Sequence, residues 1–145
     1  INQTMSLKNK TIDKNMKSDR LLLDVNFNLI TEKMKQLITY LNLNYNQKIT
    51  IPFLSKKFNS NRTKLLKEFQ QATNLSIYQY LIHIRMIAAI TLLKNTTIPI
   101  SEIIQKTGFV DSSNFNRMFK KYAKLSPSGY RNLFKVPNYI LNNKK

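Results

Sequence analysis

Cysteine is absent from this chain of 145 residues, and its absence excludes several kinds of chemistry. Without a thiol the protein cannot form disulfides, hold a metal through thiolates or use a cysteine nucleophile. The chain also contains only 2 Gly and 4 Pro, residues that are frequent in the turns of sandwiches and barrels. Leu, Ile, Lys and Gln are abundant instead, and they favour helices. We therefore expect one all-α domain, or two very small ones sharing an element, in a cytoplasmic protein.

Long apolar runs are missing as well. The longest, Met86 to Ile90, is far shorter than the roughly 18 residues that a membrane-spanning helix needs. No signal-peptide pattern opens the chain. We therefore expect no membrane partner.

Acidic residues are scarce: 7 Asp and Glu stand against 24 Lys and Arg, which gives a net charge of +17 and a pI near 10.2. Such a balance favours phosphate backbones as partners and predicts binding that weakens steeply with salt. Solubility alone, or the Lys and Asn bias of an AT-rich genome, is the alternative reason for this charge. The carboxylates form no acid–base pair or metal-ligand cluster in the sequence. We expect no enzyme activity, no metal, no cofactor and a structural role for the single histidine, His83.

The most informative feature that is present is a repeat. Two segments resemble each other at a constant offset of 50 positions. The matched pairs are Asn61 and Asp111, Leu65 and Phe115, Lys67 and Arg117, Phe69 and Phe119, Leu75-Ser76 and Leu125-Ser126, and Tyr80 and Tyr130. Each copy runs from a helix-capping residue, through an apolar residue and a cation, to an aromatic residue, a break and a second helix start. Two copies of one small unit on a cationic chain make DNA the first candidate partner.

The first unit is predicted to begin with an amphipathic helix that ends near residues 44–46. Its apolar stripe consists of Ile30, Met34, Leu37, Ile38 and Leu41. Thr50 then offers an N-cap to a short helix, and Asn61 caps the next helix. That helix carries Leu65 and Phe69 inward and ends at Asn74. Two short helices joined by a tight turn indicate a helix-turn-helix.

A long bridging helix is predicted next. Ser76 and Gln79 form a capping box at its start. Its main apolar stripe consists of Leu81, Ile84, Ala88 and Leu92. Because further apolar residues lie off that stripe, we expect the helix to be buried between two packed units. From Ser76 to Lys94 it would measure about 28 Å at 1.5 Å per residue. That length is close to the roughly 34 Å between successive major grooves on one face of B-DNA.

The second unit is expected to repeat the first. A short helix containing Ile100, Ile103 and Ile104 should be followed by a turn over residues 108–111 and a helix capped by Asp111 or Ser112. Ser126 and Pro127 open a last short helix. The expected organisation is a linker or the end of a missing upstream domain in residues 1–29, the first unit with the bridging helix in 30–94, the second unit in 95–133, and a basic tail in 134–145. Since residue 1 is Ile rather than Met, we expect a piece of a longer protein.

The second helix of each unit would meet DNA with the face that points away from the buried aromatic residues. The residues expected to contact bases are Arg62, Thr63, Leu66, Lys67, Ser113, Asn114, Asn116 and Arg117. Arg and Lys suit guanine, Asn suits adenine, and Thr or Leu can contact a thymine methyl group. The residues expected to contact phosphates are Lys64, Gln70, Ser112, Lys120 and Lys121.

One long segment resembles the signature of the AraC/XylS family of transcription regulators. It runs from Ile100 to Arg131 and reads ISEIIQKTGFVDSSNFNRMFKKYAKLSPSGYR. The segment from Leu81 to Leu93, with Arg85 and Ala89, resembles the linker helix of that family. The resemblance covers about residues 31–133 and implies seven helices that form two helix-turn-helix units joined by one long helix. It also implies sequence-specific binding to promoters, usually for activation, with RNA polymerase as a partner and a possible homodimer through an upstream domain.

Some residues depart from the family pattern. Ser55 and Ile104 stand where a small Ala is usual, and Lys124 stands where the family usually has Gly. Lys is a poor residue for the left-handed conformation, so we expect the helix before Lys124 to end differently from its counterpart at Asn74. Leu66 and Glu68 are atypical for the first unit.

Two other functions remain open. One is an RNA- or ribosome-associated basic helical protein, and the other is a protein-binding regulator that lacks strong DNA affinity. Association with RNA would be favoured by exposed aromatic residues that stack on bases. The aromatic residues expected to point inward instead are Phe69, Tyr80, Phe115 and Phe119.

Overall fold

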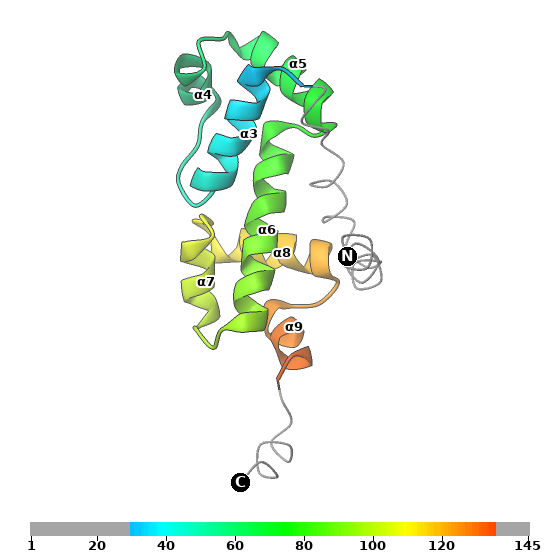
Figure 1. Ribbon diagram of the computed structural model, residues 1–145. Helices are drawn as coiled ribbons and strands as arrows, with labels where there is room; N and C mark the ends of the chain where they lie inside the picture. Colours follow the sequence, from blue (N-terminus) through cyan, green and yellow to red (C-terminus); the bar gives the residue numbers. More distant parts are fainter. Residues whose placement is uncertain (1–29, 136–145) are drawn as a thin grey trace, which may run out of the picture.

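The computed structural model describes residues 30–135, which form seven α-helices and no strand (Figure 1). The helices are α3 (Glu32–Asn44), α4 (Ile51–Lys57), α5 (Arg62–Thr73), α6 (Ile77–Asn95), α7 (Ile100–Lys106), α8 (Ser112–Ala123) and α9 (Pro127–Leu133). The predicted all-α fold is confirmed. Figure 1 shows α6 as a central rod, with α3, α4 and α5 around one half and α7, α8 and α9 around the other. The predictions for residues 1–29 and 136–145 lie outside the described residues.

Side-chain caps define the helices of the first unit. The Thr50 hydroxyl accepts a hydrogen bond from the Phe53 amide at 3.3 Å and starts α4. Asn61 Oδ1 accepts from the Lys64 amide at 2.8 Å and starts α5. Asn74 ends α5 in the left-handed conformation, with φ of 59°. These caps were predicted, and each N-cap is worth about 1 kcal/mol.

A first core is built by α3, α4, α5 and the N-terminal half of α6. Its buried residues are Met34, Leu37, Ile38, Leu41, Leu54, Leu65, Phe69, Ile77, Tyr80, Leu81 and Ile84. The rings of Phe69 and Tyr80 pack edge to face with their centroids 5.4 Å apart. The Tyr80 hydroxyl donates to Asn42 Oδ1 at 2.8 Å. Burial raises the pKa of this hydroxyl, and the Asn42 hydrogen bond lowers it less, so Tyr80 stays a neutral donor that ties α6 to α3.

A second core joins α7, α8 and α9 to the C-terminal half of α6. Its buried residues are Ile82, Met86, Ala89, Ile90, Leu93, Ile103, Ile104, Phe109, Phe115, Phe119 and Tyr130. The aromatic rings form a continuous row, with centroid distances of 5.1 Å from Phe109 to Phe115, 5.7 Å from Phe115 to Phe119 and 5.6 Å from Phe119 to Tyr130. Asp111 caps α8 and Ser126 caps α9 through their side chains. The buried aromatic residues were predicted.

The two cores lie on opposite faces of α6. A helix turns by about 100° per residue, so the α6 residues of the first core and those of the second core project in nearly opposite directions. The prediction that α6 is buried between two packed units agrees with this arrangement, but the predicted main stripe was wrong in the second half of the helix. Ala88 and Leu92 are only half-buried, whereas Ala89 and Leu93 are buried. The sequence pattern did not show on which side of α6 the second unit packs.

The end of α8 also differs from expectation. Lys124 adopts the left-handed conformation with φ of 62°, and its amide donates to the Lys120 carbonyl at 2.9 Å. Asn74 ends α5 in the same way. The expectation of a different helix end at Lys124 was wrong, because the chain must reverse within two residues to reach the Ser126 cap of α9. This demand outweighs the preference of Lys against a positive φ.

Replacing Lys124 by Gly is therefore expected to stabilise the domain. The left-handed conformation costs a residue with a Cβ atom about 1 kcal/mol, and Gly removes that cost. The free energy of unfolding should rise by about 1 kcal/mol in urea denaturation followed by circular dichroism. Asn74→Gly is the matched control and should have a smaller effect, because Asn tolerates this conformation. Equal effects of the two substitutions would contradict the assignment of strain to Lys124.

Among residues 30–135 no single helix has the length and apolar character of a membrane span. Only α5 and α6 taken together, across a bend of 51°, reach that length and composition. The apolar residues of α6 are the ones that build the two cores.

Candidate nucleic-acid interface

The turns of the two helix-turn-helix units begin in the same way. The Ser60 amide donates to the Ser55 carbonyl at 2.9 Å, and the Phe109 amide donates to the Ile104 carbonyl at 3.2 Å. Each turn contains one residue with positive φ, Asn59 in the first and Gly108 in the second. The second turn has one more residue than the first between its helix caps. Despite this difference, each turn leads into a 12-residue helix, α5 or α8.

Most of the predicted contact residues on α5 are exposed. Leu65 and Phe69 are buried in the first core, and the exposed residues are Arg62, Thr63, Lys64, Lys67 and Gln70. Lys64 Nζ lies 3.8 Å from Glu68 Oε1, so part of its charge is neutralised. Leu66 is half-buried and packs against the first core. Leu66 therefore has less surface to offer a thymine methyl group than its neighbours on α5.

The exposed face of α8 is more cationic. Phe115 and Phe119 are buried, and the exposed predicted residues are Ser112, Ser113, Asn116, Arg117, Lys120 and Lys121. Asn114 is half-buried, and its Oδ1 accepts a hydrogen bond from Arg117 Nη2 at 2.9 Å. This bond holds the Arg117 guanidinium along the helix and leaves its other donors available. Asn114 can thus position Arg117 as well as contact a base itself.

Charge distinguishes the two helices. The α8 sequence contains three cations and no acidic residue, whereas α5 contains three cations and Glu68. The nearest acid to α8 in the sequence is its N-cap Asp111, whose Oδ1 is engaged with the Ser113 amide at 2.8 Å. The face of α8 therefore has the higher density of uncompensated positive charge, which favours contact with a polyanion.

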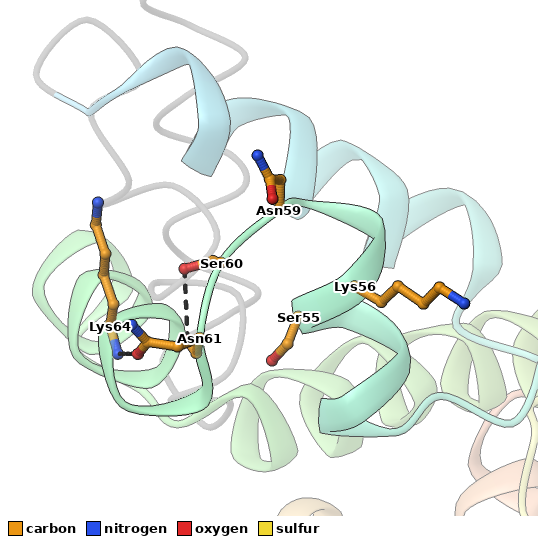
Figure 2. Close-up of a pocket in the computed structure, with 6 residues that line it drawn as sticks. All are labelled: Ser55, Lys56, Asn59, Ser60, Asn61 and Lys64. Atoms are coloured by element: carbon orange, nitrogen blue, oxygen red, sulfur yellow. Dashed lines mark hydrogen bonds between the residues drawn. The ribbon is translucent and has the colours of Figure 1, made fainter.

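A polar hollow lies at the turn of the first unit (Figure 2). It is lined by Ser55, Lys56, Asn59, Ser60, Asn61 and Lys64. Figure 2 shows Lys56 and Lys64 extending away from the turn on different sides, while the Ser60 hydroxyl donates to the Asn61 carbonyl at 3.4 Å. The Ser55 hydroxyl is buried beneath it and has no hydrogen-bond partner within residues 30–135. Lys56 is the cation that α4 contributes to the lining of this hollow.

Sequence reasoning missed the lysines beside this turn. Lys56 is exposed at the C-terminal end of α4, and Lys33 reaches from α3 to donate to the Asn59 carbonyl at 3.4 Å. The available signal was the pair of basic residues in the last turn of α4. Lys57 has a different role, because its Nζ lies 4.8 Å from the Tyr40 ring centroid.

Comparison with known sequences gives a family match. Residues 54–133 match the family described as "Helix-turn-helix domain". The chain is 32% identical over 117 residues to the lactose operon transcription activator of Staphylococcus xylosus. This match covers 81% of this chain and 42% of that protein. It is 39% identical over 87 residues to the Msm operon regulatory protein of Streptococcus mutans. This match covers 60% of this chain and 31% of that protein. The chain spans less than half the length of these relatives.

Comparison with solved structures supports the same architecture. The C-terminal domain of AraT, a response regulator from Geobacillus stearothermophilus, superposes with a TM-score of 0.71 at 26% sequence identity. The match covers 77% of this chain and 93% of that domain. The two-unit arrangement around one long helix is therefore shared with a solved domain over most of its length.

Proposed function

This chain belongs to the AraC/XylS-type helix-turn-helix family, and from this we propose that it is a sequence-specific DNA-binding transcriptional regulator. Helices α5 and α8 would enter successive major grooves from one side of the duplex. The observation that carries the proposal is the pair of equivalent helices whose apolar edges are buried and whose cationic faces are exposed. The units are joined by α6, whose 19 residues measure about 28 Å in length. This helix length is comparable with the roughly 34 Å between successive major grooves on one face of B-DNA.

The residues near the N-terminal ends of α5 and α8 are proposed to read bases. They are Arg62, Thr63, Leu66 and Lys67 on α5, and Ser113, Asn114, Asn116 and Arg117 on α8. We propose that α8 contributes more sequence discrimination than α5, because it contains the Asn114–Arg117 pair and no acid. Partial burial of Leu66 and pairing of Lys64 with Glu68 reduce what α5 can offer.

A second set is proposed to contact phosphates. It consists of Lys64, Gln70, Ser112, Lys120 and Lys121, together with Lys56 at the turn of the first unit. Contacts of this kind hold the register of the protein on the duplex without reading its sequence.

Replacing Lys120 by Ala is expected to weaken binding equally on preferred and random DNA. Binding of the variant neutralises one phosphate fewer and therefore releases one counterion fewer. The slope of log K against log salt should become shallower by about 1. Fluorescence anisotropy over a salt series measures both quantities. Lys35→Ala on α3, where Lys35 Nζ lies 3.9 Å from Glu32, removes the same charge away from the proposed interface and should leave the slope unchanged. An unchanged slope for Lys120→Ala would remove Lys120 from the phosphate set.

The experiment that tests the proposed function is selection of bound sequences from a random DNA pool, followed by footprinting. A preferred sequence with two protected regions about one helical turn apart is expected. Enrichment of no sequence, together with weak binding to all of them, would contradict sequence-specific recognition.

Further properties of the whole protein are also proposed. The name of the Staphylococcus xylosus relative describes an activator. By analogy with it, and by the family resemblance, we propose activation of transcription with RNA polymerase as a partner, in the cytoplasm, and dimerisation through an upstream domain. We propose that the activity is binding rather than catalysis. His83 is buried in α6, and the centroid of its ring lies 6.2 Å from that of the Tyr122 ring.

The burial of the aromatic residues favours duplex DNA over single-stranded RNA. Phe69, Tyr80, Phe115 and Phe119 are all buried in the cores, as predicted. Among residues 30–135, the large exposed aromatic residues belong to different parts of the fold, namely Phe53 on α4, Tyr78 on α6 and Phe134 after α9. They do not form the row along α5 or α8 that stacking on successive bases would need.

A further inference from the structure

Three segments of the chain meet at Arg85, in the middle of α6. We propose that Arg85 is a positioning residue that fixes the angle between the two helix-turn-helix units and so sets the spacing of the two DNA half-sites that the protein accepts. The DNA part of this inference rests on the proposed function, whereas the angle between the units does not.

The contacts of Arg85 with the first unit are two hydrogen bonds to the backbone. Its Nε donates to the Tyr45 carbonyl at 2.7 Å, and its Nη2 donates to the Gln47 carbonyl at 3.0 Å. Both carbonyls belong to the loop between α3 and α4. A planar guanidinium that donates from two nitrogens fixes direction as well as distance. The loop that precedes the first helix-turn-helix is therefore tied to a defined point on α6.

The contacts of the same group with the second unit come from the turn between α7 and α8. The Arg85 guanidinium carbon lies 6.0 Å from the centroid of the Phe109 ring. Gly108, with φ of +88°, packs so closely that an added Cβ would lie 2.8 Å from the Tyr45 carbonyl oxygen and 3.1 Å from Arg85 Nε. The second turn thus touches both Arg85 and the loop that Arg85 holds. Gly108 is required here both by its positive φ and by this close approach.

The place of Arg85 on α6 explains why it can join the units. The two cores occupy opposite faces of the helix. At about 100° per residue, Arg85 projects between those faces. It is half-buried there, and burial lowers the pKa of its guanidinium, which nevertheless retains its charge at neutral pH. A residue at this position can resist rotation of one unit relative to the other about the axis of α6.

A fixed angle has a direct consequence for DNA. One extra base pair between two half-sites moves the second by about 3.4 Å along the duplex and turns it by about 34°, because B-DNA has 10–10.5 base pairs per turn. A rigid pair of units should accept one spacing and reject its neighbours. A pair that can rotate should accept several.

The angle can be tested without DNA by pulsed electron paramagnetic resonance. The chain contains no cysteine, so Gln71→Cys on α5 and Gln105→Cys on α7, both at exposed positions, accept spin labels specifically. We expect a narrow distance distribution in the parent and a distribution at least twice as broad in Arg85→Lys. Lysine keeps the charge but loses the two-nitrogen contact. An equally narrow distribution at the same distance in Arg85→Lys would overturn the proposal.

The matched control is Arg131→Lys. Arg131 on α9 also donates to backbone carbonyls, with Nη1 at 2.6 Å from the Ile98 oxygen and Nε at 3.5 Å from the Leu93 oxygen. These contacts lie within the second unit, so the distribution between the labels should stay narrow. Should Arg85→Lys unfold the first unit, Gly108→Ala changes the same junction from the other side and leaves the Arg85 side chain intact. It is also expected to shift or broaden the distribution, and an unchanged distribution would count against the proposal.

The spacing preference is tested with duplexes in which 0, 1 or 2 base pairs are inserted between the selected half-sites. The parent should prefer one spacing by at least ten-fold, and Arg85→Lys should reduce that preference to about two-fold while binding an isolated half-site within two-fold of the parent. A retained ten-fold preference would overturn the DNA part of the inference. If the parent binds no DNA, the proposed function fails, and the distance measurement still decides whether Arg85 holds the units.

Discussion

Replacement of Phe119 by Ala is expected to destabilise the second unit by about 3–5 kcal/mol, the usual cost of truncating a buried Phe. Phe119 is fully buried in α8, and its ring packs against Phe115 and Tyr130. Loss of the ring leaves a cavity at the point where α8 meets α9 and α6. Because the first core consists of other residues on the opposite face of α6, it should be affected less. Hydrogen exchange of individual amides measures the two units separately.

The matched substitution in the first unit is Phe69→Ala, since Phe69 is the counterpart of Phe119 and is equally buried. This substitution should lower the protection of amides against hydrogen exchange more in α3 and α5 than in α8. Val110→Ala is the neutral control, because Val110 is fully exposed in the second turn, and surface changes usually stay within about 0.5 kcal/mol. If Phe119→Ala lowered protection in α3 and in α8 by the same amount, the two cores would form one cooperative unit and the prediction would be wrong.

The sequence predicted the helix starts well because N-capping is local. The side chains of Thr50, Asn61 and Ser76 each accept from an amide three residues later, so the residues that decide the cap are adjacent in the chain. The buried residues of α3 were also predicted, because they recur on the one face that packs against the core, whereas the predicted Ile30 lies before the Thr31 cap. Both features can be predicted without knowing how segments that are distant in the sequence pack together.

Predictions failed where distant segments decide the outcome. The burial of Ala89 rather than Ala88 depends on the side of α6 on which α7 and α9 pack. The left-handed conformation of Lys124 depends on the chain reversal before α9 and runs against the preference of Lys. The intrinsic conformational propensity of a residue is a weak guide in such places, because tertiary contacts override it.

The candidate interface shows the same division. Exposure of Arg117 and Lys120 followed from the period of α8, because the buried phenylalanines mark the opposite face. The contacts of Arg85 did not follow, since its acceptors are the backbone carbonyls of Tyr45 and Gln47 in a loop about 40 residues earlier. Backbone acceptors leave no signature in the side-chain pattern. The junction between the units was therefore visible only in three dimensions.

Replacement of Arg117 by Ala is expected to reduce binding to the preferred DNA sequence by about 1–3 kcal/mol, the value of a bidentate contact with guanine. Binding to random DNA should fall much less, and the preference at one base position should relax. The Arg117 guanidinium is already oriented by its bond to Asn114 Oδ1, so little side-chain freedom is lost when it meets a base. Selection from a random pool with the variant protein measures both the affinity and the relaxed position.

Arg117→Lys separates base reading from contact with phosphate. Lysine keeps the charge but cannot donate from two nitrogens in one plane, so a base-reading Arg117 predicts that Lys loses nearly as much discrimination as Ala. A phosphate contact predicts instead that Lys restores most of the binding. Lys106→Ala removes one positive charge from α7, where Lys106 Nζ lies 3.7 Å from Glu102, and should change neither affinity nor preference strongly. Equal losses on preferred and random DNA for Arg117→Ala, with rescue by Lys, would move Arg117 to the phosphate-contacting set and leave Asn114 and Asn116 as the main base-reading candidates on α8.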